Sequence, residues 1–149
     1  MQIEDSVALV TGAGRGLGTE WVRQLHERGA RKIYAAVRDT SRPTLPGAEL
    51  IEIDVTDQNT VTRAAAAAAD VTLLVNNAGI TSHSRFLDTD LAAVRQQFET
   101  NFFGPLSLAL AFAPILGGNG GGGIVNVLTA LAWFAYEGEG PYAASKAAA

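Results

Sequence analysis

The sequence predicts an α/β fold in which helices cover both faces of a doubly wound parallel sheet, a three-layer αβα arrangement. Short runs rich in Val, Ile and Leu alternate along the chain with longer segments of helical periodicity. A glycine-rich turn follows the first of these runs directly and leads into an amphipathic segment. Brief apolar runs are typical of strands buried on both faces, and their alternation with helices builds parallel sheets.

The apolar runs are expected to form strands at Val7–Thr11, Lys32–Val37, Leu50–Asp54, Val71–Asn76 and Ile124–Leu128. Helical periodicity is found at Gly16–Glu27, Gln58–Ala69 and Leu91–Leu116. Asp88 is expected to cap the third helix and Thr56 or Asp57 the second, because short polar side chains accept hydrogen bonds from the free amides of a first helical turn. The crossover Arg38–Ala48 contains two prolines and a glycine, so we expect no full helix between the second and third strands.

Length and composition limit the class of protein. With 149 residues and 48% hydrophobic content, residues 1–149 can bury one core and are expected to form a single domain. The chain is nevertheless shorter than the roughly 200 to 250 residues that many single α/β domains contain, and it stops inside a helical pattern at Lys146–Ala149. We therefore expect the domain to be truncated at its C-terminus.

Charge and residue usage exclude several kinds of partner. The net charge of −4 and a pI near 5.1 are unfavourable for nucleic acid or an anionic membrane, which attract basic surfaces. The most apolar helical segment, Leu106–Leu116, is too short to span a bilayer and contains a proline. The chain has no cysteine, and its two histidines have no neighbouring metal ligands, so no metal site is expected. The N-terminus enters the first strand without a secretory signal, which favours a cytoplasmic protein.

The segment Thr11–Gly18 reads Thr-Gly-Ala-Gly-Arg-Gly-Leu-Gly and lies between the first strand and the first helix. Glycines in such a turn let the backbone approach a pyrophosphate, and the helix N-terminus that follows offers unpaired N–H groups and the positive end of the helix dipole. A plain glycine turn is the alternative. The strand before the turn and the amphipathic helix after it favour a dinucleotide site.

Tyr142 and Lys146 are spaced i and i+4, so they share one face of the last helical segment. An ammonium group beside a phenol favours the ionised form and lowers the phenol pKa from its usual value near 10, as a general acid or base requires. Because this spacing occurs by chance in many helices, the pair is informative only together with other motifs.

Other motifs stand before this pair in a definite order. After the glycine turn come Asn76-Asn77-Ala78-Gly79, then Asn101-Phe102-Phe103-Gly104, then the hydroxyl residue Thr129 and finally Tyr142 and Lys146. In motifs, order and spacing the sequence resembles the short-chain dehydrogenase/reductase family over nearly all of its length. The resemblance implies a Rossmann-like sheet that lacks the family's last strands and helices, and an oxidoreductase that uses NAD(P).

The resemblance also implies roles for individual residues. The catalytic residues would be Asn101, Thr129, Tyr142 and Lys146. The cofactor-binding residues would be Gly12, Arg15, Gly16, Leu17, Gly18, Arg38, Asp54, Val55, Asn77, Ala78 and Gly79, together with Tyr142 and Lys146. Tyr142 would exchange the proton, while Lys146 would hold the nicotinamide ribose and lower the Tyr142 pKa. Thr129, where the family usually has Ser, would bind the substrate oxygen, and Asn101 would anchor a water molecule that leads to Lys146.

The choice of cofactor depends on the end of the second strand. An acidic residue there would bind the ribose 2′-hydroxyl of NAD, whereas an arginine accommodates the 2′-phosphate of NADP. Arg38 follows the strand and Arg15 lies in the glycine turn. By resemblance to family members with basic residues at both places, we expect NADP. NAD is the alternative, because Asp39 could meet the ribose hydroxyls if the strand ended later.

The predicted function is therefore an NADP(H)-dependent oxidoreductase that interconverts a carbonyl and an alcohol by hydride transfer. A small molecule would be the substrate, and the resemblance implies a homodimer or homotetramer. The alternative is a nucleotide-binding or oligomerising remnant, or a redox sensor, without turnover, because the strand Ile124–Leu128 would be an unprotected sheet edge. Trp133, Phe134 and Tyr136 could line an apolar substrate pocket or cover an edge of the core.

Overall fold

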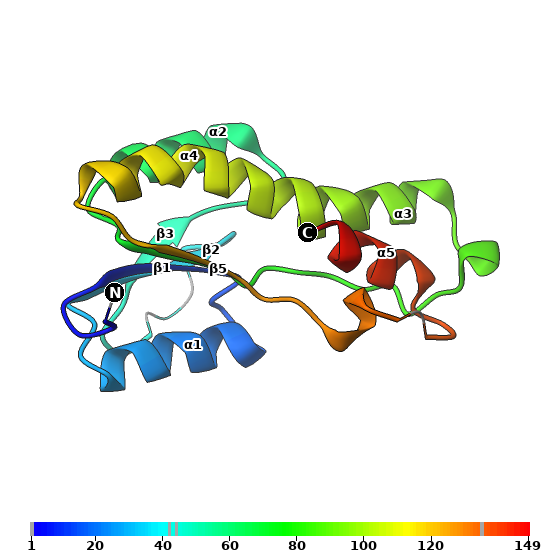
Figure 1. Ribbon diagram of the computed structural model, residues 1–149, viewed down its shortest axis with the longest axis horizontal. Coiled ribbons are helices and arrows are strands. Elements are labelled where there is room, and N and C mark those ends of the chain that lie inside the picture. Colours follow the sequence, from blue (N-terminus) through cyan, green and yellow to red (C-terminus); the bar gives the residue numbers. More distant parts are fainter. Residues whose placement is uncertain (1, 42, 44, 135) are drawn as a thin grey trace.

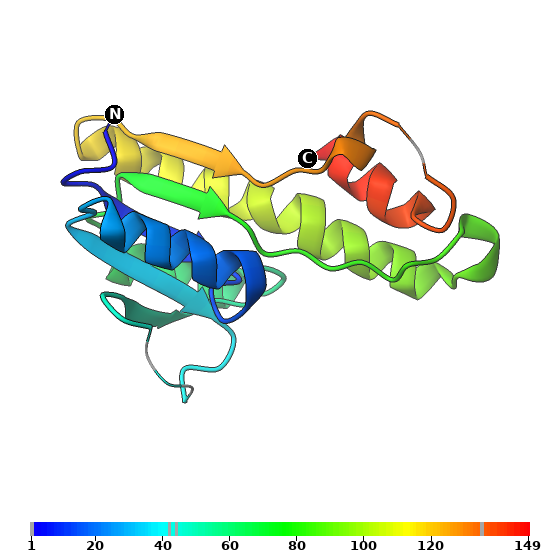
Figure 2. The same ribbon diagram turned by 90° about the horizontal axis from the view of Figure 1, so that it is seen from below.

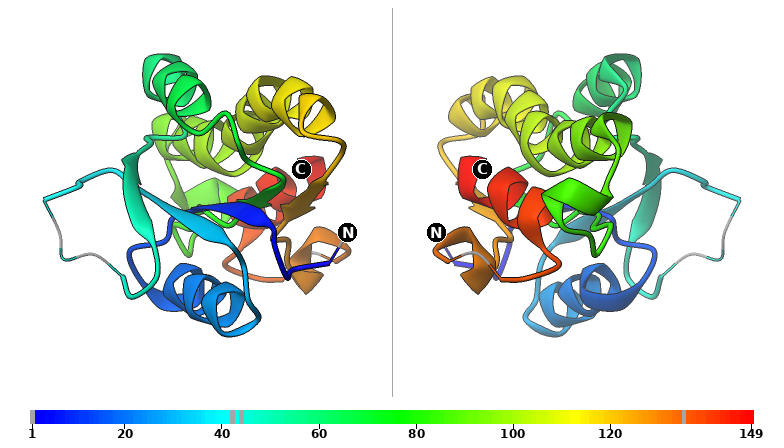
Figure 3. Two further views of the ribbon diagram at one scale, coloured as in Figure 1. Left: turned by 90° about the vertical axis from the view of Figure 1, so that its left-hand side faces the viewer. Right: turned by 90° about the vertical axis from the view of Figure 1, so that its right-hand side faces the viewer.

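The computed structural model describes residues 2–41, 43, 45–134 and 136–149. In this part of the chain, five parallel strands form one sheet in the order β3-β2-β1-β4-β5. Helices cover both faces: α1 lies on one face, and α2 and α4 lie on the other (Figure 1 and Figure 3). The fold is the predicted three-layer, Rossmann-like αβα arrangement.

The strands are β1 (Val7–Thr11), β2 (Lys32–Val37), β3 (Glu49–Glu52), β4 (Leu73–Asn76) and β5 (Gly123–Asn126). The α-helices are α1 (Gly16–Glu27), α2 (Gln58–Ala67), α3 (Leu91–Phe98), α4 (Gly104–Gly118) and α5 (Gly140–Ala148). Shorter helical turns are η1 (Phe86–Asp88), η2 (Glu99–Phe103) and η3 (Ala130–Ala132). The last three strands are shorter than predicted, because each pairs only where its neighbour in the sheet runs alongside it.

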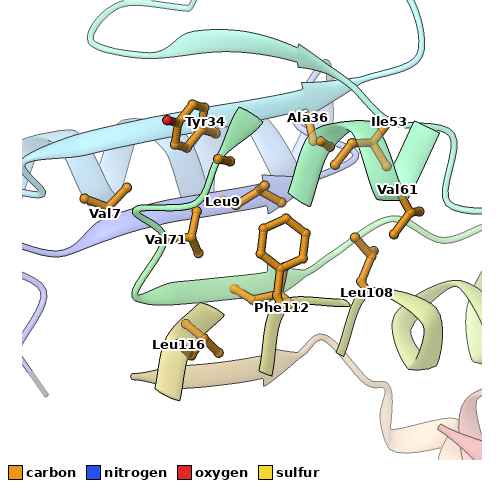
Figure 4. Close-up of a cluster of buried hydrophobic side chains, with 13 residues drawn as sticks. Val7, Leu9, Tyr34, Ala36, Ile53, Val61, Val71, Leu108, Phe112 and Leu116 are labelled. Carbon is orange, nitrogen blue, oxygen red and sulfur yellow. The ribbon is translucent and has the colours of Figure 1, made fainter. Parts of the chain in front are cut away.

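The core forms two layers, because alternate residues of a strand face opposite sides of the sheet. In β1, Val7 and Leu9 pack with α2 and α4, whereas Ala8 and Val10 pack with α1. Figure 4 shows the first layer, with the ring of Phe112 lying among side chains from the strands. Leu108, Phe112 and Leu116 recur at every fourth residue and are all buried, so one face of α4 rests on the sheet.

The predicted long helix is continuous but not uniform. α3 passes into the π-helical turn η2, and η2 passes into α4. The expectation that Asp88 caps this helix is wrong, because Asp88 lies in η1 and pairs with Arg85. Asp90 is the cap, and its carboxylate accepts a hydrogen bond of 2.7 Å from the Ala93 N–H. Asp57 caps α2 by accepting a hydrogen bond from the Asn59 N–H.

The helical run from Leu91 to Gly118 has 28 residues and contains an 18-residue stretch with a mean hydropathy of 1.4, so by length and composition alone it could cross a membrane. The segment Leu106–Leu116 that was considered in the sequence is too short to cross a membrane. Core helices of globular domains can have the same length and composition. Because one face of α4 packs on the sheet, these two properties do not identify a membrane span here.

All strands point toward the end of the molecule at which α3, η1 and α5 lie (Figure 2). The strand order changes direction between β1 and β4, since β1 is followed outward by β2 and β3 on one side and by β4 and β5 on the other. In doubly wound sheets, ligands bind outside the carboxyl ends of the strands at such a switch point. The segments that follow β1 and β4 are therefore the expected place for a ligand.

Candidate active site

A cleft of about 860 Å³ opens at the carboxyl ends of the strands. All the residues expected from the sequence to bind a cofactor line its wall, from Gly12 after β1 to Lys146 in α5. Further lining residues that the sequence did not single out include Thr81, Gln96, Glu99 and Thr100. Asn101 and Thr129, two of the four predicted catalytic residues, are not among the lining residues described.

The glycine turn brings the start of α1 close against the end of β1. A Cβ atom on Gly18 would lie 2.1 Å from the main-chain oxygen of Gly12, so no other residue fits there without a shift of the backbone. Gly12 itself has a φ of 64°, which favours glycine. Arg15, at the N-cap of α1, makes no side-chain capping bond. Free N–H groups at this helix end, beside the cleft, suit a phosphate.

Thr11 joins the two segments at the switch point, a role that sequence analysis missed. Its buried hydroxyl accepts hydrogen bonds of 3.0 Å from the main-chain N–H groups of both Asn77 and Ala78. The Asn77 side chain donates in return to the Thr11 carbonyl at 2.9 Å. A hydroxyl residue at the last position of a strand, directly before a glycine turn, is the signal that could have revealed this role.

Charged side chains are distributed unevenly around the cleft. Arg15 and Arg38 are both exposed on its wall. Asp39 is not a lining residue, and its carboxylate accepts hydrogen bonds from the N–H of Ser41 at 2.9 Å and from its hydroxyl at 2.7 Å. The cleft wall therefore carries two exposed cationic side chains, Arg15 and Arg38.

Asp54 lines the cleft and also forms part of the turn that leads into α2. Its side chain accepts hydrogen bonds from the Thr56 N–H at 3.0 Å and hydroxyl at 2.7 Å. The Thr56 N–H above all, and then the Thr56 hydroxyl and the charge of Arg38, hold the pKa of Asp54 below its usual value against the opposing effect of burial. The carboxylate is therefore ionised at neutral pH.

Tyr142 and Lys146 reach the cleft from α5. The Lys146 side chain is buried, and its Nζ atom donates a hydrogen bond of 2.8 Å to the Val127 carbonyl. Burial lowers the pKa of Lys146. The pKa of Tyr142 is raised, first by burial and then by the negative charge of Glu139. The expectation that Lys146 lowers the Tyr142 pKa is therefore wrong for this structure.

Asn101 connects the chain after β4 to α5. Its Nδ2 donates to the Ile80 carbonyl and to the Ser145 hydroxyl, both at 2.9 Å, and its Oδ1 accepts from the Ile80 N–H at 2.9 Å. The π-helical turn η2 carries this side chain, and such turns are frequent at functional sites. A Cβ atom on Gly79 would lie 3.3 Å from Asn101 Oδ1 and 3.5 Å from Lys146 Nζ, so Gly79 lies close to both side chains.

The Thr129 side chain makes a hydrogen bond to a residue close to it in the sequence. Its hydroxyl accepts a hydrogen bond of 3.3 Å from the Leu131 N–H at the start of η3, and the neighbouring Leu128 lines the cleft instead. Trp133, Phe134 and Tyr136 are exposed by 90%, 57% and 66%. These three aromatic side chains therefore do not cover an edge of the core.

Residues 6–149 match the family model described as short chain dehydrogenase. The chain belongs to the short-chain dehydrogenase/reductase family. Among its relatives in this family, carbonyl reductase (NADPH) 2 of Sus scrofa is 33% identical over an alignment of 146 residues, covering 95% of this chain and 60% of that protein. Galactitol 2-dehydrogenase (L-tagatose-forming) of Cereibacter sphaeroides is 38% identical over 135 residues, covering 85% of this chain and 53% of that protein.

Solved structures of the short-chain dehydrogenase/reductase family have the same fold. A short-chain dehydrogenase from Burkholderia cenocepacia, in complex with NADP, matches with a TM-score of 0.94 at 47% identity, over 99% of this chain and 63% of that one. A member from Burkholderia phymatum, in complex with NAD, matches with a TM-score of 0.89 at 28% identity, over 99% and 57%. The chain spans about half to three fifths of the length of the relatives that it matches.

Proposed function

We propose that this protein is an NADP(H)-dependent oxidoreductase that interconverts a carbonyl and an alcohol, with Tyr142 as general acid and base. The observation that carries the proposal is that one cleft joins the uncapped N-terminus of α1 to Tyr142 and Lys146. A dinucleotide needs a phosphate site at one end and a proton-transferring group at the other, and the cleft offers both.

NADP is the preferred coenzyme in this proposal. The exposed guanidinium groups of Arg15 and Arg38 suit a 2′-phosphate, whereas Asp39 is not among the lining residues and its carboxylate accepts hydrogen bonds from Ser41. A carbonyl reductase named for NADPH and a family structure in complex with NADP support this choice. The related structure in complex with NAD keeps NAD as the second candidate.

When bound, the nicotinamide supplies a hydride to the carbonyl carbon or accepts one from the alcohol carbon. Tyr142 donates its phenolic proton to the carbonyl oxygen as the C=O double bond becomes a single bond. In the reverse direction the Tyr142 phenolate accepts the hydroxyl proton. Because burial and Glu139 raise the Tyr142 pKa, the phenol is protonated at neutral pH, which suits reduction.

The other predicted catalytic residues have supporting roles in this proposal. Lys146 would hold the ribose hydroxyls of the nicotinamide half, because its ammonium group has three N–H donors and the bond to the Val127 carbonyl uses one of them. Asn101 would anchor the water molecule that leads to Lys146, while its side chain keeps Ile80 in place. Thr129 would donate its hydroxyl hydrogen to the substrate oxygen, since the Leu131 N–H occupies only an acceptor site of that hydroxyl.

A binder of NADP(H) without turnover is the second candidate. It is favoured by the hydroxyl of Thr129, which is engaged with Leu131 and does not line the described cleft. Fluorescence titration with NADPH, followed by steady-state NADPH oxidation with a panel of ketones, separates the two. Binding with turnover supports the oxidoreductase, binding alone supports the sensor or remnant, and failure to bind NADPH or NADH contradicts both.

We further propose that the protein forms a homodimer or homotetramer through the outer face of the long helix. Phe103, Leu106 and Leu110 are exposed there by 48%, 43% and 70%. Large apolar side chains gathered along one helix face are typical of an interface. Sedimentation velocity over a range of protein concentrations tests this, with Leu110→Lys expected to shift the protein toward monomer and an unchanged distribution counting against the interface.

A further inference from the structure

The helix α5 is held at both of its ends, with Tyr142 between them. Its C-terminal half is held by the hydrogen bonds of Ser145 and Lys146 described above. At its start, Glu139 reaches across to the segment that follows β4. Glu139 Oε2 accepts a hydrogen bond of 2.9 Å from the Thr81 hydroxyl, and Glu139 Oε1 lies 2.5 Å from His83 Nδ1. His83, which has no predicted role in the sequence, is thus one of two partners of a single carboxylate.

Glu139 is not acting as a helix cap. An acidic residue just before a helix usually accepts hydrogen bonds from the first-turn amides. Glu139 is at this position before α5 but makes no side-chain capping bond. Its side chain is only 17% exposed, and its partner Thr81 lies 58 residues earlier in the sequence. The carboxylate therefore connects two segments that are distant in the chain.

A packing contact reinforces the two polar contacts. Phe86 of η1 lies against Gly140, where a Cβ atom would come within 2.7 Å of the Phe86 ring. Thr81, His83 and Phe86 thus all contact Glu139 or Gly140. Because Thr81 also lines the cleft, the segment that contacts the start of α5 is also part of the cleft wall.

We propose that Glu139 is a positioning residue, whose carboxylate clamps the start of α5 to Thr81 and His83 and thereby sets where the Tyr142 phenol stands beside the cleft. The inference rests on the proposed function of Tyr142. Tyr142 lies in the first turn of α5, so a shift of the chain at Glu139 moves the phenol with it. Among the described residues the Tyr142 hydroxyl has no hydrogen-bond partner, and the Ser145 hydroxyl donates to the Tyr142 carbonyl and not to the phenol. The position of the phenol therefore depends on its backbone.

Glu139→Ala tests the clamp, with Glu137→Ala as the matched control. Glu137 has the same charge as Glu139, but its side chain is 83% exposed. Its carboxylate lies 3.6 Å from the guanidinium group of Arg85. A misplacement of about 1 Å in a catalytic group can cost roughly 100-fold in rate. We expect Glu139→Ala to lower kcat for ketone reduction about tenfold or more while the KM for NADPH changes less than about twofold. Glu137→Ala should leave both unchanged.

A second readout does not depend on turnover. Amide hydrogen exchange at Ala143 and Ala144 should become faster in Glu139→Ala and stay unchanged in Glu137→Ala, because only the former releases the first turn of α5. If the unmodified protein has no turnover, the proposed function fails, whereas the exchange measurement still tests the clamp. Equal exchange and equal kcat in the two variants would overturn the inference.

Two further variants separate hydrogen bonding from charge. Glu139→Gln keeps an oxygen for the Thr81 hydroxyl, so it should stay within about threefold of the unmodified kcat and should fold even where Glu139→Ala does not. A kcat as low as that of Glu139→Ala would show that the charge acts and not the clamp. Thr81→Val removes the hydroxyl that donates to Glu139. Combining Thr81→Val with Glu139→Ala should lower kcat no further than the more severe of the two single changes. A fully additive loss would overturn the inference.

Discussion

The ammonium group of Lys146 donates a 2.8 Å hydrogen bond to the main-chain oxygen of Val127, and this bond ties α5 to the chain just beyond β5. Lys146 is 6% exposed, and this burial lowers the pKa of its ammonium group. Because the bond to Val127 uses one of the three N–H donors of the ammonium group, the others can donate to a further acceptor, such as the hydroxyls of a ribose.

Replacing Lys146 by Met should abolish most of the activity but little of the stability. Met keeps the length of the side chain, and relief from burying a charge offsets the lost hydrogen bond, so the free energy of unfolding should change by less than about 1.5 kcal/mol. Ketone reduction should fall by about 10²-fold or more. Thermal unfolding and steady-state kinetics check the two parts. A loss of stability above about 3 kcal/mol would instead make Lys146 a structural residue.

Tyr142→Phe removes the phenolic proton and leaves the ring. Reduction of a ketone should fall by about 10² to 10⁴-fold, because the carbonyl oxygen loses its general acid. NADPH affinity should stay within about twofold, since the ring still lines the cleft. Tyr136→Phe is the control, as the same hydroxyl is removed from a residue that is 66% exposed. Similar rates in the two variants would refute the role of Tyr142.

The two directions of the reaction should differ in their pH dependence. Burial and then the Glu139 charge raise the Tyr142 pKa above its ordinary value. Reduction uses the protonated phenol, so its rate should be flat from about pH 6 to 9, whereas oxidation uses the phenolate and should increase up to about pH 10 and beyond. Initial rates in both directions measure this. An oxidation rate that levels off near pH 7 would mean that the phenol ionises far more readily than its surroundings here allow.

Arg38→Asp should reverse the preference for the coenzyme. In the unmodified protein we expect NADPH to bind at least about tenfold more tightly than NADH, or about 1.4 kcal/mol, through the cationic wall of the cleft. A carboxylate at residue 38 would repel the 2′-phosphate and accept a hydrogen bond from a 2′-hydroxyl. Arg28→Asp makes the same charge change at the C-cap of α1 and should preserve the order. Equal affinities in the unmodified protein would contradict the assignment of NADP.

Phe112→Ala should destabilise the fold strongly. Its ring is 0% exposed and lies at the centre of the layer between α4 and the sheet, so its loss leaves a cavity that costs about 3 to 5 kcal/mol. Phe134→Ala removes the same ring from a site that is 57% exposed and should cost less than about 0.5 kcal/mol. Urea unfolding of both variants checks the difference. A cost below about 1 kcal/mol for Phe112→Ala would show that the core refills the cavity.

The residues of the cleft wall could be predicted from sequence because they stand in short motifs at strand ends. A parallel sheet brings the carboxyl ends of its strands together, so Gly12, Arg38, Asp54 and Asn77 meet although they are far apart in the chain. Thr129 was harder to place. Its neighbour Leu128 faces the cleft, and the Thr129 hydroxyl finds a nearer donor in the Leu131 N–H, a local competition typical of Thr side chains.

The sequence by itself determined the parallel α/β architecture and the glycine turn, because apolar periodicity and backbone conformation are properties of neighbouring residues. Only the tertiary structure decided which polar atoms meet across the fold. It placed Asn101 between Ile80 and Ser145, and Glu139 against Thr81, through packing that no local pattern encodes. The direction of the shift in the Tyr142 pKa belongs with these contacts, because burial of the phenol and its distance to the Glu139 charge exist only once the chain has folded.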